Sequence, residues 1–255
     1  METVLITGAS SGIGKAYAYE FAKRGYNLII TARRGEVLDE ISKELSEKYN
    51  VECTAIPLDL SEDFSANRLV SEIEERNITV DILINNAGFA TKGALADTDF
   101  DKQHKEINVN IMALTELTYL LIEKMADRGN GIVINVGSVS GFNPSPYNAV
   151  YSASKAYVLS FTQSINYEYG EKGVYALVVC PQSTNTHFFD TFNKMSGKMR
   201  EPEDVVNSTF KAMKKKKVIC TDGTLCKLQN VMSHIFSRKV CLKIMGKAGA
   251  SLWGN

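Results

Sequence analysis

Residues 7–14, with the sequence TGASSGIG, restrict what this chain can fold into more than any other stretch. They follow the apolar run of residues 4–7, which is typical of a buried strand, and they open a helical pattern that includes Phe21 and Ala22. Glycines in a strand-turn-helix unit let the backbone approach a pyrophosphate, which rests on the positive end of the helix. We interpret the stretch as a phosphate-binding turn, and a tight turn that only packs a helix on a strand is the poorer explanation.

The rest of the chain alternates between strand-like and helix-like patterns. We expect strands at residues 4–7, 27–32, 51–58, 80–84, 131–136, 174–179 and 218–220. Helices are expected after the glycine turn and at residues 36–49, 100–125 and 149–169, with further helix starts at Ser61 and Glu201. This alternation predicts the α/β class, with a doubly wound parallel sheet of about seven strands and helices on both faces.

Length and composition favour one domain over residues 1–255, because 44% hydrophobic and 23% charged residues are ordinary for a globular chain of this size. The five cysteines form no C-x-x-C pair, and their odd number fits no closed set of disulfides. The chain begins directly with its first predicted strand, which leaves no room for a leader, and no apolar run reaches the length of a membrane span. We therefore expect reduced thiols and a cytoplasmic location.

Tyr151 and Lys155 are the strongest candidates for chemistry. On the predicted helix over residues 149–169 they are four residues apart and lie on one face. A nearby ammonium favours the phenolate, so we expect Lys155 to lower the pKa of Tyr151 toward neutral pH. The pair then provides general acid-base chemistry without histidine. By itself this spacing is common on solvated helix faces, so other motifs must support it.

Two further motifs follow predicted strands. The sequence NNAG at residues 85–88 comes after the fourth strand, and Ser138 ends the run of the fifth. With the glycine turn and the Tyr-x-x-x-Lys pair, they make the chain resemble the short-chain dehydrogenase/reductase family over roughly its first three quarters. The resemblance implies a Rossmann-like fold and a catalytic set of Asn110, Ser138, Tyr151 and Lys155. Asn110 matches the family pattern better than Asn108 does, although a satisfied core amide would also explain it.

The resemblance also implies a nicotinamide cofactor and no metal. The second strand ends at Ala32 and not at an acidic residue, while Arg33 and Lys15 can meet a 2′-phosphate, so we predict NADP(H). A surface role for these cations, and for Arg34 in particular, remains open. The full set of expected cofactor contacts is Gly8, Ser10, Ser11, Gly12, Ile13, Gly14, Lys15, Arg33, Arg34, Asp59, Leu60, Asn86, Ala87, Gly88, Tyr151, Lys155, Pro181, Gln182, Thr184 and Thr186.

The last third of the chain departs from the family in two places. Gln182 stands where the family has glycine, and it either faces the site or is a surface substitution. Residues 187–200 are rich in phenylalanine and methionine, so they are a candidate lid over an apolar substrate, although core packing would also explain them. Residues 224–255 form a basic amphipathic extension. It is compatible with packing on its own domain, which we favour, or with a cleft cover, an oligomer interface or a membrane surface.

Charge is unevenly distributed along the chain. Residues 211–255 contain ten Lys or Arg and the single acid Asp222, so this segment carries +9 and the rest −9. A solvated basic face is the favoured explanation, and attraction to anionic lipid or to a phosphate-bearing substrate is the alternative.

These features predict a reversible carbonyl reductase in which Tyr151 protonates the developing alkoxide, Ser138 holds the substrate oxygen, Lys155 supports Tyr151, and Asn110 holds a water. The substrate is expected to be an apolar 3-oxoacyl thioester, a steroid-like ketone or a broader set of carbonyls. A cofactor-binding sensor without catalysis and a membrane-surface adaptor are the alternatives. The resemblance further implies a homodimer or homotetramer formed through the two long helices.

Overall fold

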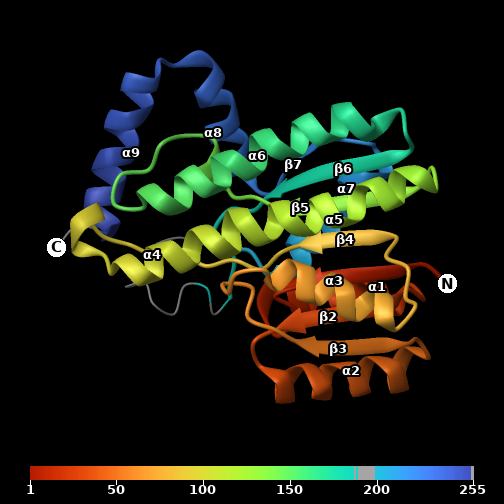
Figure 1. Cartoon of the computed structure of the whole chain (residues 1–255). Coiled ribbons are helices and arrows are strands. Elements are labelled where there is room, and N and C mark those ends of the chain that lie inside the picture. Colours follow the sequence, from red (N-terminus) through yellow and green to blue (C-terminus); the bar gives the residue numbers. More distant parts are fainter. Residues whose placement is uncertain (187, 189–198, 254–255) are drawn as a thin grey trace.

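A parallel sheet of seven strands forms the centre of the protein in the computed structural model, which describes residues 1–186, 188 and 199–253. The strand order is β3-β2-β1-β4-β5-β6-β7, as Figure 1 shows. Crossovers on both sides of β1 produce the predicted doubly wound topology. The strands are β1 (Thr3–Thr7), β2 (Asn27–Ala32), β3 (Cys53–Pro57), β4 (Ile82–Asn85), β5 (Gly131–Val136), β6 (Val174–Cys180) and β7 (Ile219–Thr221).

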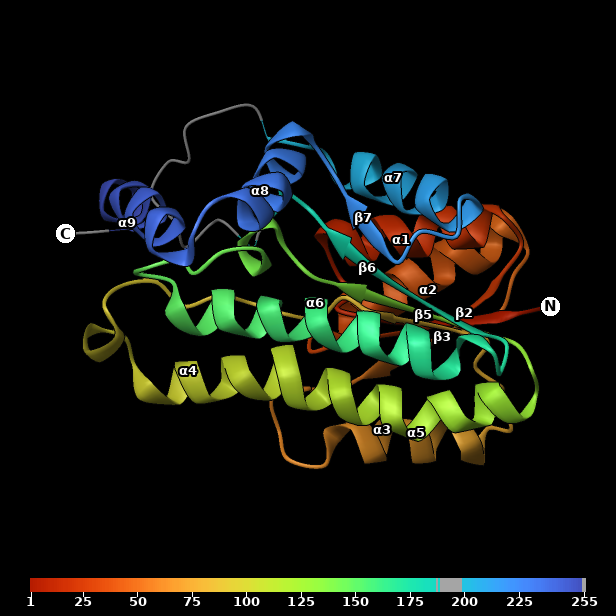
Figure 2. The ribbon, with the colours of Figure 1, turned by 90° about the horizontal axis from the view of Figure 1, so that it is seen from above.

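Two helical layers cover the sheet (Figure 2). Helices α1 (Gly12–Lys23), α2 (Gly35–Tyr49) and α7 (Pro202–Lys214) cover one face, and α3 (Ser65–Glu75), α4 (Phe100–Ile107), α5 (Leu114–Asp127) and α6 (Ala149–Gly170) cover the other. The alternation of side chains along β1 explains why both faces are apolar: Val4 and Ile6 pack on the first layer, and Leu5 packs on the second. Helices α8 (Thr224–Ile235) and α9 (Arg238–Trp253) lie beyond the carboxyl ends of the strands (Figure 1).

The predicted single α/β domain with a seven-stranded sheet is confirmed, but one helix start and the continuity of another helix were predicted wrongly. Helix α3 begins at Ser65 and not at Ser61, because the Ser61 N–H and hydroxyl both donate to Asp59 Oδ1 and form a turn. The helix predicted over residues 100–125 is interrupted by a π-helical turn at Asn108–Ala113. Apolar residues continue at helical spacing through this turn, at Ile107, Ile111 and Leu114, so the sequence pattern did not reveal the extra residue.

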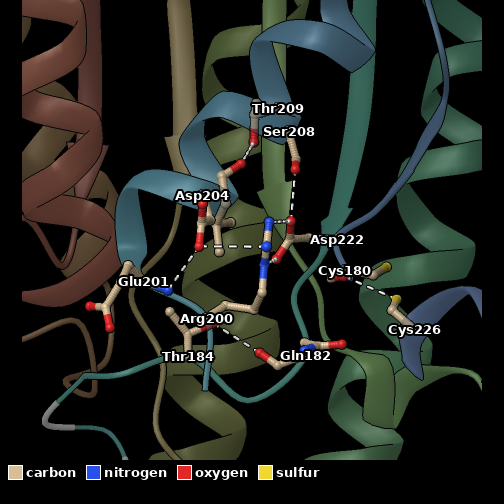
Figure 3. Close-up of polar contacts among 11 residues, drawn as sticks. Cys180, Gln182, Thr184, Arg200, Glu201, Asp204, Ser208, Thr209, Asp222 and Cys226 are labelled. Carbon is tan, nitrogen blue, oxygen red and sulfur yellow. Dashed lines mark hydrogen bonds and ion pairs between the residues drawn. The ribbon is translucent and has the colours of Figure 1, made fainter. Parts of the chain in front are cut away.

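An ion pair with a buried carboxylate fixes the chain beyond β6 (Figure 3). Arg200 donates from Nη2 to Asp222 Oδ1 at 2.9 Å and from Nε to Asp222 Oδ2 at 3.2 Å. The Asp222 side chain has 0% exposure, and Ser208 of α7 donates to the same carboxylate at 2.7 Å. Arg200 also pairs through its backbone with Ser183 and Asn185. The cluster therefore ties the loop after β6 to α7 and to the end of β7.

Removal of the carboxylate from this cluster is expected to destabilise the fold. Asp222→Asn keeps the volume but removes the buried carboxylate that accepts from both Arg200 and Ser208, and it leaves Asp204, at 3.5 Å, as the remaining counter-charge of Arg200. The free energy of unfolding should therefore fall by about 2 kcal/mol. Urea denaturation followed by circular dichroism measures the change. In the matched control Glu72→Gln, which breaks an exposed ion pair with Arg76, the loss should stay below about 1 kcal/mol. Equal losses in the two variants would contradict this account.

Candidate active site

Three of the four predicted catalytic residues meet where β5 ends and α6 begins. Tyr151 shares a hydrogen bond with Ser138, and the Lys155 Nζ lies 5.7 Å from the centre of the Tyr151 ring. Lys155 donates to the carbonyl oxygen of Val136, the last residue of β5, at 2.8 Å. Tyr151, Ser138 and Lys155 keep 9%, 8% and 4% of their surface exposed, so the cluster is almost dry but still reachable. Such a cluster can hold a substrate oxygen and exchange a proton with it.

The fourth predicted residue, Asn110, lies in the π-helical turn between α4 and α5. Its Oδ1 accepts from the Phe89 N–H at 3.2 Å, and its Nδ2 donates to the Phe89 carbonyl at 3.0 Å and to Ser154 Oγ at 3.1 Å. The side chain therefore acts first as a clamp between the loop after β4 and helix α6. Single π turns inside α-helices occur often at functional sites, which agrees with the predicted role of Asn110.

The expected lowering of the Tyr151 pKa is wrong for this structure. Burial raises the pKa of Tyr151 to about 12, and the Ser138 hydrogen bond opposes this rise only in part. Burial likewise lowers the pKa of Lys155 to about 8, although the neighbouring acidic groups Cys180 and Glu106 act in the opposite direction. Removal from water disfavours the charged form of both groups, and it is the largest cause of both shifts. Tyr151 is thus a neutral acid at neutral pH, and Lys155 is protonated.

The glycine turn has the geometry that a dinucleotide pyrophosphate requires. Gly8 and Gly12 have φ values of +68° and +54°, and a Cβ on Gly14 would lie 2.3 Å from the Gly8 carbonyl oxygen. Ser11 precedes α1 without a side-chain hydrogen bond to the first turn of the helix. The close backbone and the N–H groups at this helix start are compatible with an anionic group, and the pyrophosphate contact itself stays a prediction.

The NNAG motif supports this turn. The backbone N–H groups of Asn86 and Ala87 both donate to Thr7 Oγ1 at 2.9 Å, and the Asn86 amide donates to the Thr7 carbonyl at 2.9 Å. A Cβ on Gly88 would lie 2.8 Å from Asn110 Oδ1 and 3.6 Å from Lys155 Nζ. The motif therefore joins the glycine turn to the catalytic cluster, and Gly88 leaves the space between them open.

The basic residues near the turn are placed differently from one another. Arg34 donates from Nη2 to Ser10 Oγ at 3.0 Å, whereas Arg33 is exposed at the end of β2. Lys15 lies over the Tyr19 ring at 5.6 Å. The sequence had favoured Arg33, but the residue that the structure joins to the turn is Arg34.

The loop after β6 brings one predicted contact to the turn. A Cβ on Gly12 would lie 2.9 Å from Thr186 Cγ2, so these two residues face each other. The Gln182 side chain lies instead against Gly223, at the start of α8, while buried Thr184 donates to the Gln182 carbonyl at 2.9 Å (Figure 3). The Pro181 carbonyl accepts from the Val139 N–H at 2.9 Å, which ties this loop to the one that carries Ser138.

Asp59 and Leu60 serve the local structure first. Asp59 forms the turn with Ser61, and Leu60 packs in a small apolar cluster with Val109 and Ala113. Of the predicted lid, Phe188, Met199 and Arg200 are described, and the remainder lies outside the described residues. The Phe188 ring lies 5.5 Å from the Tyr151 ring, between centroids, so an apolar group does cover the tyrosine.

Sequence reasoning missed Glu106, a buried carboxyl on α4 next to the cluster. The available signal was its spacing, because Glu106 follows Gln103 by three residues and precedes Asn110 by four, which places three polar residues on one helix face. Arg200 and Asp222 were also missed, since nothing local shows that residues 22 positions apart form a pair. Within the described part of the chain, no group of His, Cys, Asp and Glu has the arrangement of a metal site.

Comparison with known proteins agrees with this arrangement. The sequence model described as short chain dehydrogenase matches residues 2–197. The chain belongs to the short-chain dehydrogenase/reductase family. The very-long-chain 3-oxoacyl-CoA reductase of Mus musculus is 34% identical over 184 residues, which cover 71% of this chain and 58% of that protein. The Bos taurus reductase is 34% identical over 220 residues, covering 83% and 68%. The chain thus spans less than two thirds of the mouse protein.

Solved structures of family members have the same fold. A short-chain dehydrogenase from Sphingobium yanoikuyae in complex with NADPH has a TM-score of 0.82 at 32% identity, covering 86% of this chain and 87% of that one. A 7beta-hydroxysteroid dehydrogenase has a TM-score of 0.86 at 27% identity, covering 96% of each chain. In the second case the likeness includes the region of α8 and α9, which lies beyond residue 197.

The buried lysine of this family member should make its stability depend on pH. The pKa of Lys155 falls from 10.5 to about 8 on folding, so the unfolded chain binds more protons between these values. Stability contributed by this group therefore rises with pH across that window, by about 3 kcal/mol. We expect the unfolding free energy of the unmodified protein, measured against Lys155→Met, to increase accordingly. A flat difference would contradict the lowered pKa, and Lys172→Met, at an exposed position, is the control.

Proposed function

We propose that the protein is an NADP(H)-dependent oxidoreductase that interconverts a carbonyl and a secondary alcohol on an apolar substrate. The observation that carries the proposal is the contact of Ser138, Tyr151 and Lys155 in a nearly dry site, joined through the NNAG motif to a pyrophosphate-binding turn. A family member in complex with NADPH and relatives that reduce 3-oxoacyl-CoA support the same reaction class.

Each residue has a role that its surroundings allow. A nicotinamide cofactor held by the glycine turn would supply or accept the hydride. Ser138 and Tyr151 hold the substrate oxygen by hydrogen bonds, and Tyr151, neutral at pH 7, donates its proton as the alkoxide develops. Protonated Lys155, 5.7 Å from the tyrosine ring, stabilises the phenolate that remains. Asn110 holds the loop after β4 against α6 through its bonds to Phe89 and Ser154. We propose that it also holds a water.

The preference for NADP(H) rests on the cations at the glycine turn. Arg34 is held against Ser10, Arg33 is its exposed neighbour in the chain, and Lys15 lies in the first turn of α1, directly after the glycine turn. A 2′-phosphate would therefore meet positive charge here. Ala32, at the end of β2, offers no carboxylate for a ribose 2′-hydroxyl.

The substrate class is inferred from the apolar surroundings of Tyr151. Phe188 covers its ring, and α8 and α9, beyond the strand ends, carry many apolar side chains. A 3-oxoacyl thioester is the first candidate because several relatives are 3-oxoacyl-CoA reductases, and a steroid-like ketone is the second because a 7beta-hydroxysteroid dehydrogenase has a similar structure. A non-catalytic cofactor sensor would not need the contacts that Tyr151 and Lys155 make.

Turnover with a panel of carbonyls tests the proposal. We expect NADPH oxidation, faster than NADH oxidation, with 3-oxoacyl thioesters or steroid ketones, and at least a 100-fold loss in Tyr151→Phe because the acid is removed. The exposed tyrosine of the same helix provides the control: Tyr167→Phe should retain full activity. The sensor alternative is favoured if all three proteins bind NADPH equally well and none of them reduces any carbonyl of the panel.

We also infer a homodimer or homotetramer. The helices α4, α5 and α6 lie side by side in one layer (Figure 2). Large apolar side chains protrude from this layer and the π-helical turn within it: Met112, Tyr119 and Tyr167 are 48%, 76% and 88% exposed. A second copy would bury them.

A cytoplasmic location is proposed from the cysteines, all five of which are free thiols although four of them are buried. Among the described residues, no helix has the length and apolar character needed to cross a membrane.

We further propose that α8 and α9 make peripheral contact with an anionic membrane surface. Helix α8 does pack on the domain through buried Cys226, in agreement with the sequence. Its outer side nevertheless exposes Leu228, Val231 and Ile235, at 56%, 51% and 70%. Exposed cations accompany them, namely Lys227, Arg238, Lys239, Lys243 and Lys247, and residues 224–255 contain no acid. Apolar groups flanked by cations are what an interfacial helix requires.

Sedimentation with vesicles tests this contact. We expect binding to vesicles that contain anionic lipid, weaker binding to neutral vesicles, and at least a 10-fold loss in the double variant Lys239→Glu, Lys243→Glu, because each cation contributes about 1 kcal/mol at such a surface. Tyr167→Ser, which changes an exposed residue in the other helical layer, should bind normally. Equal binding of the double variant and the unmodified protein would exclude the contact.

A further inference from the structure

Glu106 is a fully buried acid that the proposed mechanism does not use. It lies in the last turn of α4 with 0% exposure, four residues before Asn110. Its Oε2 accepts from the Thr91 N–H at 2.8 Å and from the Thr91 hydroxyl at 2.6 Å. Its Oε1 is buried and has no hydrogen-bond partner among the described residues. One carboxyl oxygen, Oε2, thus anchors the loop after β4. The other oxygen, Oε1, takes no part in this anchor.

The charged neighbours of Glu106 are the catalytic groups. Its charge acts on Lys155 and on Tyr151, both on α6, and raises the pKa of each. Cys180, at the end of β6, faces the same two groups and acts in the same direction. Burial raises the pKa of Glu106 itself, while the Thr91 bonds and the Lys155 charge lower it. Burial raises the pKa of the Cys180 thiol well above its ordinary value, so this thiol stays protonated at neutral pH and supplies no counter-charge. The Glu106 carboxyl is then the acid of this pair that can supply one.

We propose that Glu106 is a positioning residue that provides the counter-charge for Lys155 and thereby keeps this lysine protonated while Tyr151 donates its proton. A buried ammonium needs an opposite charge or several hydrogen bonds, and the bond that the structure shows for Lys155 goes to a single backbone carbonyl. The Thr91 bonds favour the ionised form of Glu106. An amide could anchor Thr91 equally well, so the anchor alone does not require a carboxyl.

The test is the substitution Glu106→Gln, which keeps the shape and the acceptor for Thr91 but removes the charge. Lys155 should then lose its proton, and Tyr151 should ionise, at lower pH. Both changes move the alkaline limb of kcat/KM for NADPH-dependent reduction of a 3-oxoacyl thioester to lower pH, by about one unit. Asp101→Asn removes an exposed carboxylate from the same helix and should leave the limb unchanged.

A second readout does not depend on turnover. The resonance of Lys155 ¹³Cε, assigned with Lys155→Arg, reports the titration of this lysine. In Glu106→Gln the midpoint of that titration should move to lower pH by about one unit. This measurement remains valid if the thioester is not a substrate, so failure of the proposed function is distinguishable from failure of this inference.

The variant Thr91→Val covers the case in which Glu106→Gln does not fold. Loss of the hydroxyl makes Glu106 harder to ionise, so the Lys155 titration should move in the same direction by a smaller amount. An unchanged Lys155 titration in either folded variant would overturn the proposal and leave Glu106 as a structural anchor for the loop.

Discussion

The site depends on one costly feature, a lysine ammonium held almost out of water. Lys155 is 4% exposed, and the surrounding structure is arranged to tolerate its charge. The end of β5 supplies a carbonyl at 2.8 Å, Gly88 leaves room beside the Nζ, and the Glu106 carboxyl lies near enough to act on its pKa. The same lack of water makes Tyr151 a weak acid at rest. Proton transfer therefore relies on groups that stabilise the phenolate as it forms.

Buried amides and hydroxyls keep these groups in register across the sheet. Asn85 of β4 donates to Asn135 of β5 at 2.9 Å and to Thr118 of α5 at 3.1 Å, and Asn135 donates to Thr162 of α6 at 2.9 Å. A shift of one strand by one residue would leave such groups unpaired in an apolar interior, at a cost of about 1–3 kcal/mol each. The network thus holds β4, β5 and the helices that carry the catalytic side chains in a single alignment.

The chain beyond β6 is organised by charge as well as by apolar packing. The Arg200–Asp222 pair brings the loop after β6 to α7 and β7, and it leaves Thr186 facing Gly12 of the glycine turn. Helices α8 and α9 then extend over the carboxyl ends of the strands (Figure 1), where a substrate would enter. Their exposed apolar and basic side chains therefore bear on two proposals, the apolar substrate and the contact with an anionic membrane surface.

Local patterns in the sequence determined a large part of this structure. The strands, most helices and the sheet class followed from apolar runs and from the glycine turn, because backbone preference and side-chain period act over a few residues. The Tyr151 and Lys155 face followed from helical spacing in the same way. The boundary of α3 and the π turn at Asn108–Ala113 were missed, because a side-chain hydrogen bond and an inserted residue decide them.

Only the tertiary structure decided the electrostatics of the site. The sequence predicted a lowered Tyr151 pKa from its neighbour Lys155, but burial by segments distant along the chain reversed the sign. Likewise, Arg34 and not Arg33 reaches Ser10, and Glu106 acts on the pKa of Lys155 from another helix. Residue types and their spacing are local properties that a sequence displays. Desolvation depends on everything packed around a group, and it exists only once the chain has folded.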